Sequence, residues 1–239
     1  MQQLHPQKTD AILWDYDGTL VNSAPKNIDI TKEILSVVAP RLTGENLPRC
    51  LESEAAYHIA NHRSKNWQDL YLNYYGMTEA ETQLAGTLWT EFQLKNSTPV
   101  DLFPGIETTI NQLKLPHGIC SQNSSENIRK VLAANNLLQK FNAIIGYSDI
   151  PLDAQKPSPE AGIKCLEKIF GKTQNKTILY IGDHEGDVAF ARNLENELKH
   201  QNNRVIVITV TYSGAHTASW VCKPDMEISA PHQLLKIVS

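Results

Sequence analysis

Two carboxylates near the beginning of the sequence, Asp15 and Asp17, are the residues best suited to chemistry. They follow an apolar run at positions 12–14 and precede Gly18. The apolar run predicts a buried strand, and Gly18 predicts the turn that ends it. Open α/β sheets carry their chemistry at the carboxyl ends of strands. Because two neighbouring acids repel each other, this pattern indicates a cationic partner such as Mg²⁺, acting together with a phosphate ester.

Other polar groups fall at or just after the ends of three later predicted strands: Ser121, Lys156, and the pair Asp183 and Asp187. Taken singly, each has an ordinary explanation, as a helix-capping serine, a solvated loop lysine and acids that stabilise a helix dipole. Taken with the first two acids, they supply what phosphoryl transfer through a carboxylate needs. The set contains a nucleophile, a second acid, oxygen ligands for Mg²⁺, a hydroxyl and an ammonium group.

The elements that must position these groups alternate along the chain. Short apolar runs predict buried strands at Ala11–Asp15, His117–Ser121, Ala143–Gly146, Thr177–Gly182 and Arg204–Thr211. Helical patterns fall at Gly105–Lys114, Ser125–Leu137, Ser158–Phe170 (with Ser158 as the N-cap) and Asp187–Lys199. Strands that alternate with helices favour crossover connections and a mostly parallel sheet. The sequence therefore predicts an α/β fold with a Rossmann-like core.

The stretch from residue 22 to residue 100 breaks this alternation, because it contains helical patterns and no convincing strand. Thr78 and Glu81 predict a capping box, and Leu84, Leu88 and Phe92 form a stripe that we expect to pack inward. We therefore expect a catalytic core of residues 1–21 and 101–239, with residues 22–100 inserted as a helical cap domain. An insertion directly after the first strand suits a lid.

Composition narrows the class of protein. The 239 residues are 41% hydrophobic and 20% charged, which is ordinary for a soluble globular protein. A net charge of −4 with scattered basic residues predicts neither a nucleic-acid nor a membrane partner. The four cysteines are widely spaced, and Met1–Asp10 is polar, without the apolar stretch of a signal peptide. We therefore expect a cytoplasmic protein with reduced thiols, as a monomer or a small homo-oligomer.

The order and strand-end placement of the four groups resemble the haloacid dehalogenase-like superfamily of aspartate-dependent phosphatases. The stretch from Asp15 to Pro25 is particularly similar to phosphoglycolate-phosphatase-type members. The resemblance implies an enzyme that uses Mg²⁺ to hydrolyse a small phosphorylated metabolite, a phosphoglycolate-like phosphomonoester, through an aspartyl-phosphate intermediate.

The resemblance also implies a role for each residue. Asp15 would be the nucleophile, and Asp17 would protonate the leaving oxygen and then activate water. Ser121, with the backbone N–H of Gln122, would hold the phosphoryl group, and Lys156 would offset its negative charge. The Mg²⁺ ligands would be Asp15, the backbone carbonyl of Asp17, and Asp183, with Asp187 as a ligand or as a partner of one.

The sequence departs from the family pattern at two places. Ser121-Gln122-Asn123 stands where Thr-Asn is commoner, which puts the contact made by residue 122 in question. His184 follows Asp183 where a small hydroxyl residue is more usual, and we interpret His184 and Glu185 as loop residues without a catalytic role. Neither departure removes a group that the mechanism requires.

Other functions stay open from the sequence. A phosphomutase, a pyrophosphatase or a nucleotidase would share the core motifs, whereas dehalogenation does not call for an acid at Asp17. A phospho-acceptor signalling module would also combine a phosphorylated aspartate, Mg²⁺, a hydroxyl and a lysine. The long helical insertion and the second acid favour hydrolysis over such a switch.

Overall fold

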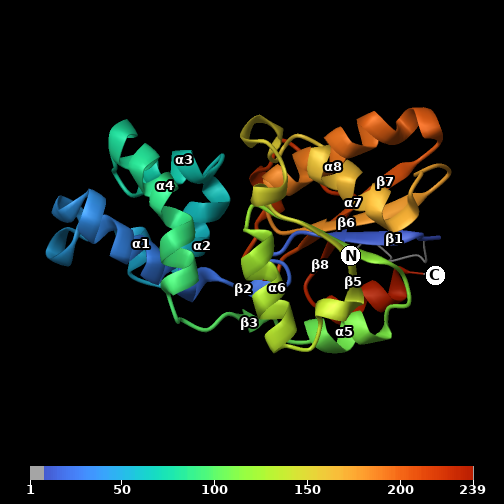
Figure 1. The fold of residues 1–239 in the computed structure, drawn as a ribbon, viewed down its shortest axis with the longest axis horizontal. Helices are drawn as coiled ribbons and strands as arrows, with labels where there is room; N and C mark the ends of the chain where they lie inside the picture. Colours follow the sequence, from blue (N-terminus) through green and yellow to red (C-terminus); the bar gives the residue numbers. More distant parts are fainter. Residues whose placement is uncertain (1–7, 239) are drawn as a thin grey trace. The chain divides into compact units, whose positions relative to one another are not determined.

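A computed structural model describes residues 8–238, which form two compact units (Figure 1). One unit comprises the described residues up to Val21 and from Leu102 onward, and the other comprises Asn22–Asp101. Residues 1–7 and 239 of the predicted core, and with them most of the polar stretch Met1–Asp10, lie outside the described residues. Across residues 8–238, no helix combines the length and the hydropathy that a membrane crossing requires.

The first unit is built on a parallel sheet, which confirms the predicted α/β fold class. Within residues 8–238 the sheet has six strands in the order β5-β4-β1-β6-β7-β8, and each neighbouring pair is parallel. The strands are β1 (Ala11–Trp14), β4 (His117–Cys120), β5 (Phe141–Ile145), β6 (Thr177–Gly182), β7 (Arg204–Val210) and β8 (Met226–Ile228). Strand order reverses at β1, and such a switch point is where open α/β sheets bind ligands.

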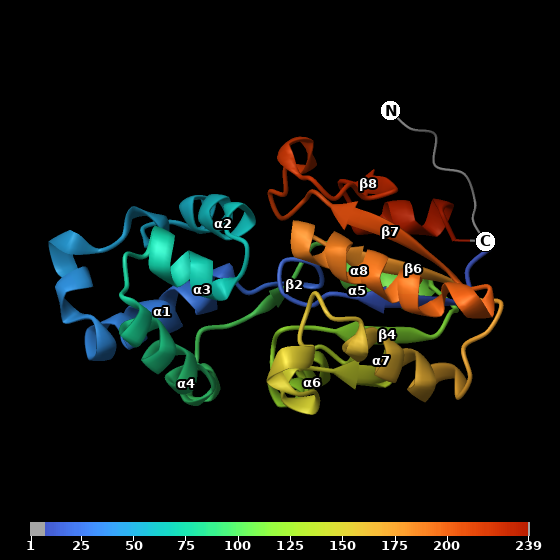
Figure 2. The same ribbon diagram turned by 90° about the horizontal axis from the view of Figure 1, so that it is seen from above.

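Helices cover both faces of this sheet (Figures 1 and 2). They are α5 (Ile106–Gln112), α6 (Ser125–Ala134), α7 (Glu160–Phe170) and α8 (Glu185–Leu198), followed by a 3-10 segment at Pro231–Lys236. Helices α7 and α8 pack on one face, and α5 packs with the 3-10 segment on the other. Two predicted starts are wrong. Pro159, not Ser158, is the N-cap of α7, and α8 begins two residues before Asp187 because His184 caps it.

The second unit is helical and has its own apolar core. It contains α1 (Ala24–Val38), α2 (Glu54–Arg63), α3 (Trp67–Asp69), a π-helical turn (Leu70–Tyr74), α4 (Glu79–Lys95) and short 3-10 turns. Two short strands, β2 (Val21–Asn22) and β3 (Asp101–Leu102), pair with each other where the chain passes between the units. Thus the predicted insertion, residues 22–100, contains helices, and its one strand residue is Asn22 at its beginning.

Helix α4 confirms one prediction and corrects another. Thr78 and Glu81 form the predicted capping box, with the Glu81 carboxylate 2.7 Å from the Thr78 backbone nitrogen. The predicted inward stripe is wrong at Leu84, whose side chain is 50% exposed, whereas Ala85 is fully buried. The next residue, Gly86, lies against the Trp67 ring so closely that an added Cβ would be 2.7 Å from it. Small residues let α4 pack closely here, and Leu84 lies beside that face.

Candidate active site

The loop after β1 brings the two leading acids to the sheet edge. The backbone N–H of Asp15 donates to the carbonyl of Ile181 at 2.7 Å, which continues the pairing of β1 with β6. The Tyr16 carbonyl then accepts N–H groups from positions 20 and 21, and this winds the loop into a tight turn. Gly18 has a φ of +75°, and an added Cβ would lie 2.2 Å from an Asp183 carboxylate oxygen. Only glycine fits this turn, because both the conformation and the space exclude a side chain.

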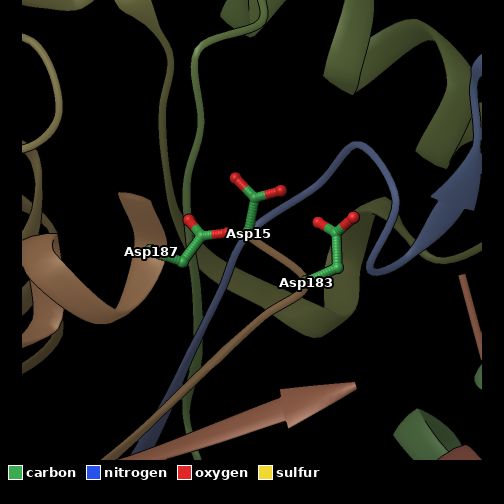
Figure 3. A group of neighbouring side chains, drawn as sticks. All are labelled: Asp15, Asp183 and Asp187. Atoms are coloured by element: carbon green, nitrogen blue, oxygen red, sulfur yellow. The ribbon is translucent and has the colours of Figure 1, made fainter. Parts of the chain in front are cut away.

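Three carboxylates converge at this edge, as Figure 3 shows. Asp15, Asp183 and Asp187 are all buried and each offers an oxygen, with these atoms within 4.8 Å of one another. Asp15 follows β1, Asp183 follows β6, and Asp187 lies in the first turn of α8. Hard divalent cations bind oxygen ligands of this kind, so the cluster fits such an ion. The carboxylate of Asp17 instead faces Asn123.

Lys156 is brought into the same cluster, although a lysine in a proline-rich loop is usually solvated. Its Nζ lies 2.6 Å from Oδ1 of Asp15 and 2.7 Å from Oδ1 of Asp187, and its side chain is only 7% exposed. The ammonium also lies over the rings of Tyr180 and Phe190, at 5.4 and 5.3 Å from their centroids. Aromatic faces favour a cation in such a position. The ammonium is therefore fixed between two acids.

The charges in the cluster are only partly balanced. Burial raises the pKa of Asp15 well above its usual value; Lys156 opposes this shift, and the charges of Asp187 and Asp183 reinforce it. Burial alone would also raise the pKa of Asp187, but the charge and hydrogen bond of Lys156 hold it below its usual value. Burial would lower the pKa of Lys156, and the two acids raise it instead. Three carboxylates face one ammonium here, so a divalent cation would favour the ionised form of Asp15.

Two hydroxyl groups donate hydrogen bonds to the carboxylate of Asp183. The Thr19 hydroxyl donates to one oxygen of Asp183 at 3.3 Å, and the Ser213 hydroxyl donates to the other at 3.4 Å. Thr19 belongs to the motif after β1, whereas Ser213 lies in the loop after β7 and was not predicted. Its only sequence signal would be its position shortly after a strand.

The predicted phosphate-binding pair lies in the loop after β4. Ser121 is buried, and its hydroxyl accepts the backbone N–H of Asn123 at 3.1 Å. Gln122 is exposed, and the contact of its backbone N–H with a phosphate stays a prediction. Ser124, not Ser121, caps α6. The buried Asn123 donates to the carboxylate of Asp17 at 2.9 Å, a contact that the sequence analysis missed.

The two residues after Asp183 have structural partners. Nδ1 of His184 accepts the backbone N–H of Gly186 at 3.0 Å and caps α8. The Glu185 carboxylate accepts the backbone N–H of Cys222 at 2.8 Å, which ties the first turn of α8 to the loop after β7. The prediction that Glu185 lies in the loop is wrong, because it begins α8. That neither residue is catalytic stays a prediction.

Comparisons with known proteins identify relatives of this chain. A phosphoglycolate phosphatase from Cereibacter sphaeroides is 27% identical over 185 residues, covering 75% of this chain and 79% of the relative. A phosphoglycolate phosphatase from Synechococcus elongatus is 25% identical and covers 96% of this chain and 97% of its own.

Solved structures share the fold over nearly the whole chain. A haloacid dehalogenase-like hydrolase from Streptococcus pneumoniae matches with a TM-score of 0.69 at 15% identity, covering 95% of this chain and 97% of the other. A predicted phosphoglycolate phosphatase from Haemophilus somnus matches with a TM-score of 0.69 at 22% identity, covering 96% and 98%. At these identities the structural matches establish the fold alone. The sequence model of haloacid dehalogenase-like hydrolases matches residues 12–209, and the chain accordingly belongs to that family, as an enzyme of its phosphatase type.

Proposed function

We propose that this protein is a Mg²⁺-dependent phosphatase that hydrolyses a small phosphomonoester through an aspartyl-phosphate on Asp15. The observation that carries the proposal is the buried group of Asp15, Asp183 and Asp187 around Lys156, at the carboxyl ends of β1 and β6. Phosphoglycolate is the first substrate to test, because the curated relatives bear that name.

The first chemical step is transfer of the phosphoryl group to the enzyme. A carboxylate oxygen of Asp15 attacks phosphorus, and the bond from phosphorus to the leaving oxygen breaks. Asp17 donates its proton to that oxygen, so the product leaves as an alcohol. Ser121 and the backbone N–H of Gln122 hold the phosphoryl oxygens, and Lys156 offsets their charge.

The second step frees the nucleophile. Asp17, now ionised, takes a proton from a water molecule, which attacks phosphorus. The bond between phosphorus and the Asp15 oxygen breaks, and inorganic phosphate leaves. One residue thus serves as an acid in the first step and a base in the second, which returns it to its starting protonation state.

The proposed metal ligands are Asp15, Asp183 and the backbone carbonyl of Asp17, with Asp187 as a further ligand or a partner of one. When bound, Mg²⁺ supplies positive charge that draws the anionic substrate to an acidic site. We also propose that residues 22–100 act as a cap that selects the substrate.

Removal of the metal is expected to abolish turnover. Without a divalent cation, the three carboxylates repel an anionic substrate and the pKa of Asp15 stays high. Turnover of an aryl phosphate should disappear after exhaustive chelation and return with Mg²⁺, while the circular dichroism spectrum stays unchanged. Ca²⁺ should inhibit, since its looser and higher coordination would misplace Asp15. Full activity in the chelated protein would refute the proposed metal dependence.

A screen of phosphorylated metabolites tests the function itself. We expect a small phosphomonoester to give the highest kcat/KM, with multiple turnovers and release of inorganic phosphate. A wide lead for pyrophosphate or a nucleotide would replace the phosphoglycolate-type proposal, and recovery of a positional isomer of a sugar phosphate would indicate a mutase. Incorporation of one phosphate per chain without release would indicate a signalling module.

A further inference from the structure

The amide of Asn123 holds the carboxylate of Asp17 in the core unit. Its Nδ2 lies 2.9 Å from one oxygen of Asp17 and 3.2 Å from the other, and Asn123 is only 5% exposed. A hydrogen bond from a neutral donor to a carboxylate is stronger than one between two neutral groups. This partly buried contact therefore restrains the rotation of the Asp17 side chain.

Asn123 is itself fixed at three points. Its backbone N–H donates to the Ser121 hydroxyl, and its backbone carbonyl accepts the N–H of Tyr147, both at 3.1 Å. Its side-chain oxygen accepts from Nδ2 of Asn127 at 3.1 Å. Because that oxygen is engaged, the amide nitrogen faces Asp17, and the reverse orientation would place an oxygen against the carboxylate. The donor is thus held in one orientation before any substrate binds.

The surrounding backbone leaves little room for this loop to move. An added Cβ at Gly146, just after β5, would lie 2.4 Å from the carbonyl oxygen of Asn123 and 2.5 Å from the backbone nitrogen of Ser125. Asn127 lies in the first turn of α6 and is 4% exposed. Packing at the end of β5 and in the first turn of α6 therefore supports the amide that contacts Asp17.

We propose that Asn123 is a positioning residue that holds Asp17 in the orientation needed for its two proton transfers, with Asn127 as its support. The inference rests on the proposed function, in which Asp17 is the acid and then the base. Loss of Asn123 should lower the fraction of time that Asp17 spends in the reactive orientation, which slows the chemical steps. Substrate binding should change little, because other groups are assigned to the phosphate.

Substitution of Asn123 by alanine tests this role. Asn123→Ala keeps the backbone N–H that donates to Ser121 and removes only the side chain. A lost hydrogen bond to a charged group corresponds to a fall in kcat of about 10- to 100-fold, with KM changed by less than about threefold. Asn127→Leu, which keeps Asn123 but removes its support, should give a smaller loss in the same direction. Asn135→Ala, just past the end of α6, is the matched control and should leave kcat unchanged.

A double-mutant cycle separates positioning from a purely structural role. In an Asp17→Asn background, Asn123→Ala should cause no further loss, because the group through which it acts is gone. Steady-state release of inorganic phosphate from p-nitrophenyl phosphate measures complete turnover, which includes hydrolysis of the intermediate, the step that needs Asp17 as a base. Thermal unfolding of each variant checks the fold. Should the alanine variant not fold, Asn123→Asp keeps the volume and the acceptor for Asn127, and should also lower kcat.

The outcomes distinguish this inference from the proposed function. If Asn123→Ala turns over at the native rate while Asp17→Asn is slow, the positioning role is wrong and the mechanism stands. If the loss persists at full size in the Asp17→Asn background, Asn123 acts elsewhere and the inference is overturned. Near-native turnover of Asp17→Asn alone would instead refute the proposed mechanism, and the positioning role with it.

Discussion

Replacement of Asp15 by asparagine is expected to abolish turnover. The carboxamide has nearly the same shape and can still accept the hydrogen bond from Lys156, but it is neutral and a poor nucleophile. No aspartyl-phosphate should form, and kcat should fall by about 10⁶-fold, the scale of the loss when a protease loses its covalent nucleophile. Phosphate release from an aryl phosphate and intact mass after an acid quench measure both effects.

The same variant should fold at least as stably as the native protein without metal. The raised pKa of Asp15 means that its charged form is disfavoured in the fold, so a neutral side chain relieves repulsion from Asp187 and Asp183. Loss of activity without loss of thermal stability would therefore identify a chemical role. Asp10→Asn, the same substitution just before β1, is the matched control and should keep native turnover. Turnover in Asp15→Asn near the native rate would exclude Asp15 as the nucleophile.

Much of the core could be predicted because its elements carry strong local signals. The strands β1, β6 and β7 are short apolar runs, and the polar residues that chemistry needs stand directly after several strands. By contrast, β8 spans only Met226–Ile228, which is too short for an alternation of apolar and polar residues to be recognised. Its position depends on pairing with β7, and on the Asp225 carboxylate, which accepts the backbone N–H of Val207 at 2.7 Å.

Helix faces and the contacts around the site were harder to predict. The stripe that includes Leu84 has helical spacing, but packing at a small residue in α4 decides which face is buried. The bond from Asn123 to Asp17 joins residues 106 positions apart in the chain and depends on one side-chain orientation. Ser213 reaches Asp183 in the same way, from a loop with no motif. Such contacts follow from tertiary packing, which residue type and spacing do not encode locally.

Replacement of Asp17 by asparagine is expected to slow turnover and to trap the intermediate. The variant keeps the nucleophile but loses the proton donor of the first step and the base of the second. General acid–base groups typically contribute ~10²–10⁴-fold, so kcat should fall by about that factor. The fold should survive, because the new carboxamide can still present its oxygen to Nδ2 of Asn123. The backbone carbonyl that is proposed to bind the metal is unchanged.

The choice of substrate separates the two roles of Asp17. An aryl phosphate has a good leaving group and needs little protonation, so its first step should be slowed less than hydrolysis of the intermediate. An aspartyl-phosphate on Asp15 should therefore accumulate and appear by intact mass and peptide mapping after an acid quench. An alkyl phosphate should be slowed in the first step as well and should accumulate less of it. Phosphate found on Ser121, or turnover near the native rate, would contradict the mechanism, because Asp17 would then perform neither proton transfer.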